Sequence, residues 1–211
     1  MKIEVFTDYT CPFCYIGKQK LMQAIEKANL QEPIEIQYKN YEVHPEIQGA
    51  VQQPYKDYLL ESMDGRAEKV DTFLAELQQH ANEVGLTYHF DTMIPANTAD
   101  AHRLAKWMVK EQKEHEWTER LMQGHFVEGE NLADREYLFS VIEELGYSKK
   151  EAKRILDGQD YQQELDQDAY DAQQIGVDRA PFFVFDNRFG IIGAEPEEVF
   201  IRTLKQTAGE N

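Results

Sequence analysis

The tetrapeptide Cys11-Pro12-Phe13-Cys14 stands between a short apolar segment and an amphipathic stretch. Residues 2–6 predict a strand, and the spacing of apolar residues from about Pro12 to Asn29 predicts a helix. Proline suits a first helical turn, because its missing N–H has no partner there. Residues 34–38 alternate with period two and predict a second strand. A crossover of this length favours a parallel pair, so the N-terminal part is expected to be a β-α-β unit.

The C-terminal part of the chain returns to a sheet pattern. Residues 182–185 form an apolar run directly after Pro181, and a three-residue turn leads into residues 189–192, so the two segments predict a hairpin. Residues 195–204 predict a final helix with Pro196 in its first turn. The tail, residues 207–211, is expected to fray.

The middle of the chain is helical in pattern, after an expected loop at residues 42–54. Asn97 and Thr98 are candidate caps, and Ser148 with Glu151 predicts a capping box. We expect helices at 55–62, 66–84, 98–122, 134–145, 148–156 and 160–174, with a turn or strand at 86–91. The predicted fold is therefore α/β, a thioredoxin-like fold with a large all-helical insertion. Residues 1–50 and 176–211 form the thioredoxin-like domain, and residues 51–175 form the insertion lobe.

Composition restricts the classes of partner. Apolar residues make up 42% of the 211 residues, which argues against disorder. The formal net charge of −17 argues against binding to nucleic acid or to an anionic membrane. The chain enters a strand at once and has no apolar run of about 18 residues, so neither a leader nor a membrane span is expected. We expect a cytoplasmic protein, and the sequence leaves its oligomeric state open.

The two cysteines are the only ones in the chain, and their spacing suits thiol–disulfide exchange. A helix N-terminus carries unpaired N–H groups and a partial positive charge, and both favour a thiolate. Cys11 is the expected nucleophile, assisted by the helix dipole and by exposure. Cys14, one turn further on, is expected to be more buried and to act as the resolving thiol. A static disulfide closing so small a loop would add little stability.

Metal binding is the competing explanation for a C-x-x-C motif. Structural zinc usually takes four ligands, from a second C-x-x-C or an H-x3-5-H. The chain has no third cysteine, and its six histidines contain no pair with that spacing. We therefore expect no metal and no bound cofactor, with glutathione as a candidate co-substrate. The expected partners are thiols and disulfides of proteins or small molecules.

Pro181 is the second candidate site residue, since in thioredoxin folds a cis-proline at this place lies beside the dithiol. It leaves the backbone of the preceding residue, Ala180, free to pair with an extended substrate. The alternative is an ordinary proline at the start of a strand. Pro12 and Phe13 are candidate substrate contacts. Phe13 carries neither charge nor hydrogen-bond donor, which predicts a less oxidising couple than a dithiol with histidine there.

Four motifs together resemble the DsbA-family oxidoreductases of the FrnE type, in the right order over nearly the whole chain. They are Cys11-Pro12-Phe13-Cys14-Tyr15-Ile16-Gly17, Asn97-Thr98-x-x-Ala101-His102-Arg103, Phe126-x-Glu128-Gly129, and Ala180–Val184 with Gly193-Ala194-x-Pro196. The resemblance implies a thioredoxin fold with a helical insertion and a redox-active Cys11–Cys14 pair. It also implies a cis-Pro181 and disulfide oxidoreductase or isomerase activity.

Two departures from the family pattern bear on substrate choice, and His102 is a further candidate site residue. Arg179 places a charge close to the dithiol, and Ile192 replaces a small polar residue before the Gly193-Ala194 turn. His102 is a candidate for the cleft, where it would exchange a proton with a thiol, because its unperturbed pKa is about 6.5. The alternative is a buried histidine that fixes its helix. The Phe126–Gly129 segment is more typical of packing than of chemistry.

Two other functions remain open from the sequence. The same family includes 2-hydroxychromene-2-carboxylate isomerases and kappa-class glutathione transferases, which generally place serine where Cys11 stands. Glutathione-dependent turnover that survives replacement of both cysteines would favour that alternative. A non-enzymatic binding or chaperone module would protect clients independently of both thiols.

Overall fold

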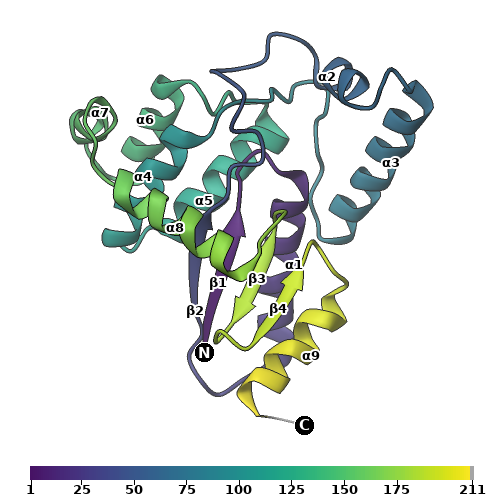
Figure 1. The fold of residues 1–211 in the computed structure, drawn as a ribbon, viewed down its shortest axis with the longest axis vertical. Helices are drawn as coiled ribbons and strands as arrows, with labels where there is room; N and C mark the ends of the chain where they lie inside the picture. The colour runs from purple at the N-terminus through teal and green to yellow at the C-terminus, as the bar shows by residue number, and fades with distance from the viewer. Residues whose placement is uncertain (210–211) are drawn as a thin grey trace. The chain divides into compact units, whose positions relative to one another are not determined.

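The computed structural model describes residues 1–209 and divides into two compact units (Figure 1). The sheet unit contains Met1–Val43 and the chain from Gln167 onward, and the helical unit is His44–Asp166. The predicted domain boundaries, after residues 50 and 175, lie a few residues later in the chain than the limits of these compact units. The predicted boundaries remain a prediction. The fold class is the predicted one, a thioredoxin-like fold with a helical insertion.

A mixed sheet of four strands, in the order β2-β1-β3-β4, forms the centre of the sheet unit. Strand β1 pairs parallel with β2 and antiparallel with β3, which in turn pairs antiparallel with β4. The elements of this unit are β1 (Lys2–Thr7), α1 (Pro12–Ala28), β2 (Glu35–Asn40), β3 (Phe182–Phe185), β4 (Phe189–Ile192) and α9 (Glu197–Ala208), with the C-terminal part of α8 (Gln162–Ile175).

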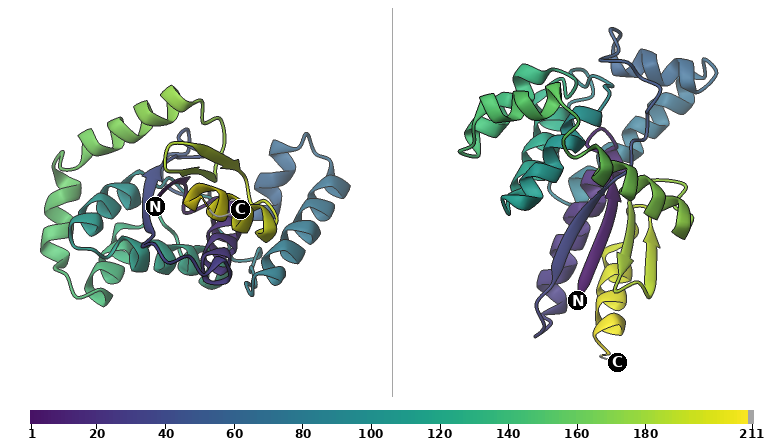
Figure 2. Two further views of the ribbon diagram at one scale, coloured as in Figure 1. Left: turned by 90° about the horizontal axis from the view of Figure 1, so that it is seen from below. Right: turned by 60° about the vertical axis from the view of Figure 1, so that its left-hand side comes forward.

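Helices α1 and α9 cover one face of the sheet (Figure 2). The alternating residues Ile3, Val5, Phe183 and Phe185 point to these helices and are at most 2% exposed. Phe183 meets Phe200 of α9 edge to face, with ring centroids 5.0 Å apart. Burial of this apolar face drives the pairing of the two chain ends, since strands far apart in sequence contribute to one core.

The helical unit is built from α2 (Tyr55–Ser62), α3 (Ala67–Glu83), α4 (Ala99–Lys110), α5 (Glu114–Gln123), η1 (Gly124–Glu128), α6 (Arg135–Glu144), α7 (Lys149–Asp157) and the start of α8. Residues 86–91 form neither helix nor strand. Tyr88 in this segment is buried and stacks on Phe126, with ring centroids 4.7 Å apart.

The prediction of a single helix at 98–122 is wrong, because α4 ends at Lys110 and a second helix, α5, begins at Glu114. Gln112 adopts a positive φ of 58°, which ends α4 without the glycine or proline that usually marks such a break. The π-helical turn η1 that follows α5 also has no marker in the sequence. Such turns depend on tertiary packing, and here His125 and Phe126 are both buried.

Two predictions at helix ends also need correction, and one is confirmed. Ser148 is the N-cap of α7, but its side chain makes no capping hydrogen bond, so the expected capping box is absent. At α4 the cap is supplied by Asn97, whose Oδ1 accepts a hydrogen bond from Ala99 N at 3.0 Å. Helix α9 continues through Thr207 and Ala208, where fraying was expected, because the Thr207 hydroxyl donates to Thr203 O within the helix. Residues 210–211 of the expected tail lie outside the described residues.

Among the helices that the structure describes, none is long and apolar enough to cross a bilayer.

Candidate active site

Cys11 and Cys14 lie at the N-terminus of α1, directly after the turn that follows β1. Cys11 is the N-cap residue, with φ −84° and ψ 112°, and Pro12 occupies the first helical position. The Cys14 N–H donates to Cys11 O at 3.0 Å, which begins the first helical turn. No side chain caps this end of the helix. The positive end of the α1 dipole therefore favours negative charge near Cys11.

Both cysteines are free thiols, and both are buried. Cys14 is 1% exposed and Cys11 is 7% exposed, so Cys14 is the more buried thiol, as predicted. The expectation that Cys11 would be exposed is wrong. Its Sγ lies 3.7 Å from Ala180 O, to which the thiol donates, so the loop before β3 covers this thiol.

Burial raises the pKa of the Cys14 thiol well above its ordinary value. The neighbouring Cys11 adds to the increase, while hydrogen bonds from Thr7 and from the Asp8 backbone act in the opposite direction. The Asp8 N–H lies 3.5 Å from Cys14 Sγ. Cys14 is therefore a protonated thiol at neutral pH.

The buried carboxylate of Asp8 organises the turn between β1 and the dithiol. Asp8 is 1% exposed, and its Oδ2 accepts a hydrogen bond from Val43 N at 2.7 Å. Its backbone carbonyl accepts from Cys11 N at 3.4 Å. Asp8 is not among the predicted site residues, although a carboxylate between an apolar strand and a C-x-x-C motif is the signal that could have found it.

Pro181 follows a cis peptide bond from Ala180, which confirms the predicted isomer. Its carbonyl accepts a hydrogen bond from Gly193 N at 2.8 Å, so the turn that follows β4 holds the proline loop. Gly17 of α1 faces the same loop. A Cβ at Gly17 would lie 3.1 Å from both Pro181 Cγ and Phe183 Cζ, closer than ordinary contact. The absence of a side chain at Gly17 therefore sets how near the dithiol helix approaches Pro181.

Arg179 is exposed and bonded to its neighbour Asp178, with Nε 3.1 Å from Oδ1 and Nη2 3.3 Å from Oδ2. Exposed pairs of this kind contribute little to stability, about 0–1 kcal/mol. Ala180 is half-buried, and Ile192 is 49% exposed beside the Gly193 turn. Pro12 and Phe13 are half-buried at the start of α1. The sheet unit thus holds Cys11, Cys14, Pro181 and the predicted substrate contacts of its own loops.

His102 belongs to the helical unit, where it is 3% exposed on α4. Its role toward a thiol stays a prediction. The adjacent Arg103 has a structural role, since its guanidinium donates to the carbonyls of residues that end α7. The acceptors are Ile155, Leu156, Gly158 and Asp160, at 2.5 to 3.4 Å.

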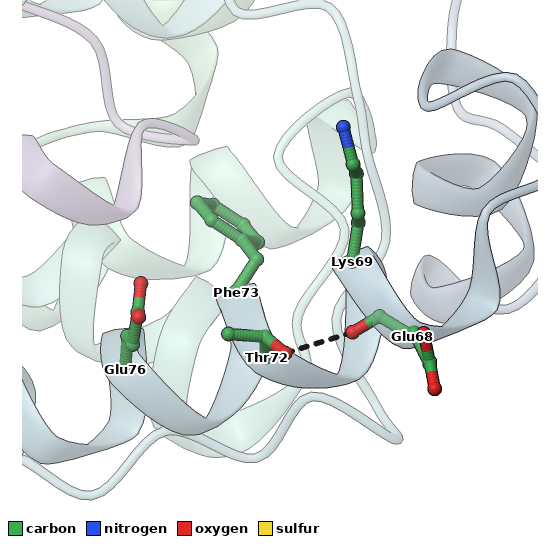
Figure 3. Close-up of a pocket in the computed structure, with 5 residues that line it drawn as sticks. All are labelled: Glu68, Lys69, Thr72, Phe73 and Glu76. Carbon is green, nitrogen blue, oxygen red and sulfur yellow. Dashed lines mark hydrogen bonds between the residues drawn. The ribbon is translucent and has the colours of Figure 1, made fainter.

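No group of three or more His, Cys, Asp or Glu side chains within residues 1–209 is arranged to hold a metal ion. A surface hollow of about 300 Å³ lies on α3 (Figure 3), lined by Glu68, Lys69, Thr72, Phe73 and Glu76. All five side chains come from one helix, and Thr72 Oγ1 donates to Glu68 O at 2.9 Å.

Comparison with known proteins identifies relatives over the whole length. Residues 2–205 match the family described as DSBA-like thioredoxin domain. The uncharacterised protein YwbO of Bacillus subtilis (strain 168) is 26% identical over 209 residues, which cover 96% of this chain and 94% of YwbO.

Solved structures give the same result. A probable DsbA oxidoreductase from Streptomyces coelicolor superposes with a TM-score of 0.91 and 27% identity, over 100% of this chain and 91% of that one. A 2-hydroxychromene-2-carboxylate isomerase gives 0.71 and 17%, over 99% and 98%. The cytosolic disulfide reductase DsbM from Pseudomonas aeruginosa with GSH gives 0.60 and 17%, over 99% and 100%. The last two share the fold with this chain.

Proposed function

Since this chain belongs to the family of DSBA-like thioredoxin domains, we propose that it exchanges thiols and disulfides through Cys11 and Cys14. Cys11 is the nucleophile, Cys14 the resolving thiol, and Pro181 the residue that shapes the substrate side of the site. The contact of Cys11 Sγ with Ala180 O at 3.7 Å, beside the cis bond to Pro181, carries this proposal. This contact brings the Cys11 thiol, at the N-terminus of α1, next to the backbone of the loop before Pro181.

The exchange proceeds in two steps. The Cys11 thiolate attacks one sulfur of a substrate disulfide, which forms a mixed disulfide and releases one substrate thiolate. Cys14 then loses its proton and attacks Cys11 Sγ, which releases the second thiolate and leaves a Cys11–Cys14 disulfide. Two electrons pass from the protein to the substrate, and the reverse sequence oxidises a substrate dithiol. Burial keeps Cys14 protonated, so it does not compete with Cys11 for the first attack.

Ala180 and Pro181 position the substrate. The Ala180 carbonyl accepts from the Cys11 thiol in the free protein. When Cys11 is in a mixed disulfide it no longer donates, and this carbonyl is left for a backbone N–H of an extended substrate. Phe13 lies between the two cysteines, and Arg179 directly precedes Ala180. We propose that both residues contact the substrate. His102, which belongs to the helical unit, is also a proposed substrate contact.

Glutathione is the proposed small-molecule co-substrate, which returns the dithiol to its reduced state. The structure of DsbM with GSH supports this choice through the shared fold. A reducing, cytoplasmic setting is proposed with it, and the cytosolic disulfide reductase DsbM, which shares the fold, supports this setting. The FrnE type and the balance between oxidation, reduction and isomerisation stay proposals, because the direction depends on potential, where about 30 mV changes the equilibrium tenfold.

Replacement of Cys14 by serine tests the proposal. The Cys14→Ser variant cannot resolve the mixed disulfide, so partners are expected to accumulate on Cys11 and to be released by dithiothreitol. Mass spectrometry of the adducts would identify them. Cys11→Ser is the matched control, with the buried thiol in place and no nucleophile. Equal recovery of adducts from the two variants, or none from Cys14→Ser under oxidative stress, would count against Cys11 as nucleophile.

A further inference from the structure

A cavity of about 410 Å³ lies in the sheet unit, between the end of β2 and the C-terminal end of α8. The residues that line it are Asn40, Tyr41, Glu42, Ala169, Ala172, Gln173 and Val177. Glu42 is the one charged side chain among them, and no residue of this described lining is basic. The cavity plays no part in the two exchange steps above.

Two features of the cavity favour a positively charged ligand. Besides Glu42, the C-terminal end of α8 carries the negative end of the helix dipole, which favours cations. The N–H groups of Gly176 and Val177 already bond Gln173 O and Ala172 O, so the helix end contributes its field and not these carbonyls as direct ligands. Asp178 and Arg179 pair with each other just beyond the lining and add no net charge.

Asn40 adds an unsatisfied acceptor to this lining. Its backbone N–H donates to Asp168 Oδ2 at 2.8 Å. Its side-chain Oδ1 is buried and has no hydrogen-bond partner among the described residues. A buried acceptor without a partner costs free energy, which a ligand with N–H donors would recover.

The cavity lies close to the dithiol along the backbone. Asn40 pairs with Thr7 at the end of β1, and the Tyr41 N–H donates to Thr7 O at 3.1 Å. On the other side, Val177 stands three residues before Ala180, whose carbonyl meets Cys11. An extended substrate bound along the Ala180 loop therefore passes near this cavity.

We propose that this cavity binds the ammonium or guanidinium group of a lysine or arginine in the substrate, close to the reacting cysteine. Glu42 supplies the charge, and Asn40 Oδ1 becomes an acceptor when the Asn40 side chain turns toward the bound group. The candidate positions for the basic residue are two to four places from the cysteine, over which an extended chain covers about 7 to 13 Å. The inference rests on the proposed exchange and adds a preference for basic peptide disulfides.

Mixed-disulfide peptides that differ in one lysine test the preference. One set carries lysine two, three or four residues from the cysteine, and the matched set carries Nε-acetyl-lysine at the same places. At low salt the ratio of kcat/KM, lysine over acetyl-lysine, is expected to reach about three- to fivefold for the best position, as for other partly exposed ion pairs. The ratio is expected to fall toward one in Glu42→Gln. Glu35→Gln, at the other end of β2 and with the same change of charge, should keep it.

Binding without chemistry separates this inference from the exchange itself. In the protein with both cysteines replaced by serine, N-acetyl-lysine methylamide should shift the backbone NMR signals of Ala172, Gln173 and Val177, and its Nε-acetyl analogue should not. A lysine ratio near one in the unaltered protein, or one that Glu42→Gln leaves intact, overturns the inference. Equal shifts from the two amides do so even if no peptide is exchanged. Exchange of all peptides at one rate would overturn the basic preference and leave the proposed function standing.

Discussion

Gly17 shows how one missing side chain sets the geometry of the dithiol site. Because a Cβ there would lie 3.1 Å from Pro181 Cγ, Gly17→Ala must displace either the proline loop or α1. Overpacking of this kind costs about 1–3 kcal/mol. Alanine also favours the helix by about 1 kcal/mol over glycine, which offsets part of the loss in stability. Because the two effects oppose each other, the free energy of unfolding is expected to change little in Gly17→Ala. The rate of exchange at Cys11 is the more sensitive measure of the changed geometry.

We therefore predict that Gly17→Ala slows formation of the mixed disulfide at Cys11 about tenfold, equivalent to about 1.4 kcal/mol in the barrier. The unfolding midpoint in urea should move little. Stopped-flow kinetics with a peptide disulfide measures the first quantity. Glu26→Ala, on the exposed side of the same helix, is the control and should leave the rate alone. An unchanged rate in Gly17→Ala would show that the close packing against Pro181 has no role in positioning.

The buried Cys14 thiol is expected to make the free energy of unfolding of the reduced protein depend on pH. Its pKa is raised by burial, so the folded state holds the proton more tightly than the unfolded state. The resulting stability is fully present below the pKa of an unfolded cysteine, about 8.5, and is lost as the pH rises above it. The free energy of unfolding of the reduced protein should fall by up to about 1.4 kcal/mol per pH unit from this group.

Urea unfolding between pH 7 and 10 measures this loss, with Cys14→Ala as the reference. The variant retains every other titrating group, so the difference between the two curves isolates Cys14. Parallel curves would mean that the Cys14 thiol is no harder to ionise in the folded protein than in the unfolded one.

At the scale of elements, helix α7 depends on a residue from α4. Arg103 is 8% exposed, and its guanidinium donates to four carbonyls at the end of α7, among them Ile155 O at 2.5 Å and Gly158 O at 2.9 Å. Terminal carbonyls of a helix have no partner within it, so this guanidinium replaces a C-cap. Lysine cannot reproduce the planar fork of donors.

Arg103→Lys is accordingly expected to lower the free energy of unfolding by about 2–4 kcal/mol, since hydrogen bonds to charged donors contribute about 1.5–3 kcal/mol each and several are lost. Urea denaturation followed by circular dichroism checks the value. Arg135→Lys is the comparison, because Arg135 is an exposed partner of Asp100 and Asp157 and should cost less than about 1 kcal/mol. Similar losses in the two variants would contradict a capping role for Arg103.

The sequence predicted the elements well where the pattern is local. The strands at both ends and α1 follow from period-two and helical spacing, and Gly85, Gly129 and Gly146 mark real turns with positive φ. The break at Gln112 and the π-helical turn at Gly124–Glu128 were missed, because a non-glycine residue at positive φ and an extra residue in a turn are imposed by packing. The same holds for Arg103, whose acceptors are more than fifty residues away.

In the candidate site, too, local features could be predicted and features that depend on distant parts of the chain could not. Cys11, Cys14 and the cis bond at Pro181 could be predicted, because a motif and a fold fix them. The burial of Cys11 could not, since it depends on the Ala180 loop arriving from the far end of the chain. Asp8 escaped notice for a similar reason, because its partner Val43 comes from beyond β2.

At the scale of the whole molecule, two compact units share one chain that begins and ends in the sheet unit. Strand β1 lies between β2 and β3, so the two chain ends form one sheet and the helical unit is an insertion between them. The net charge of −17 agrees with a preference for basic substrates at the cavity beside β2. The chain belongs to the family of DSBA-like thioredoxin domains and is similar to a probable DsbA oxidoreductase, and we propose that its chemistry takes place at the dithiol of the sheet unit.

The reduction potential of the Cys11–Cys14 pair is the measurement that tests this account most directly. The protein would be equilibrated in glutathione buffers of known potential, and the disulfide counted by intact mass. We predict one two-electron transition between about −270 and −120 mV, the range from thioredoxin to DsbA, below the upper limit because Phe13 cannot stabilise a thiolate as histidine would. A pair that never forms a disulfide, or one that stays oxidised below about −300 mV as structural disulfides do, would contradict the central claim.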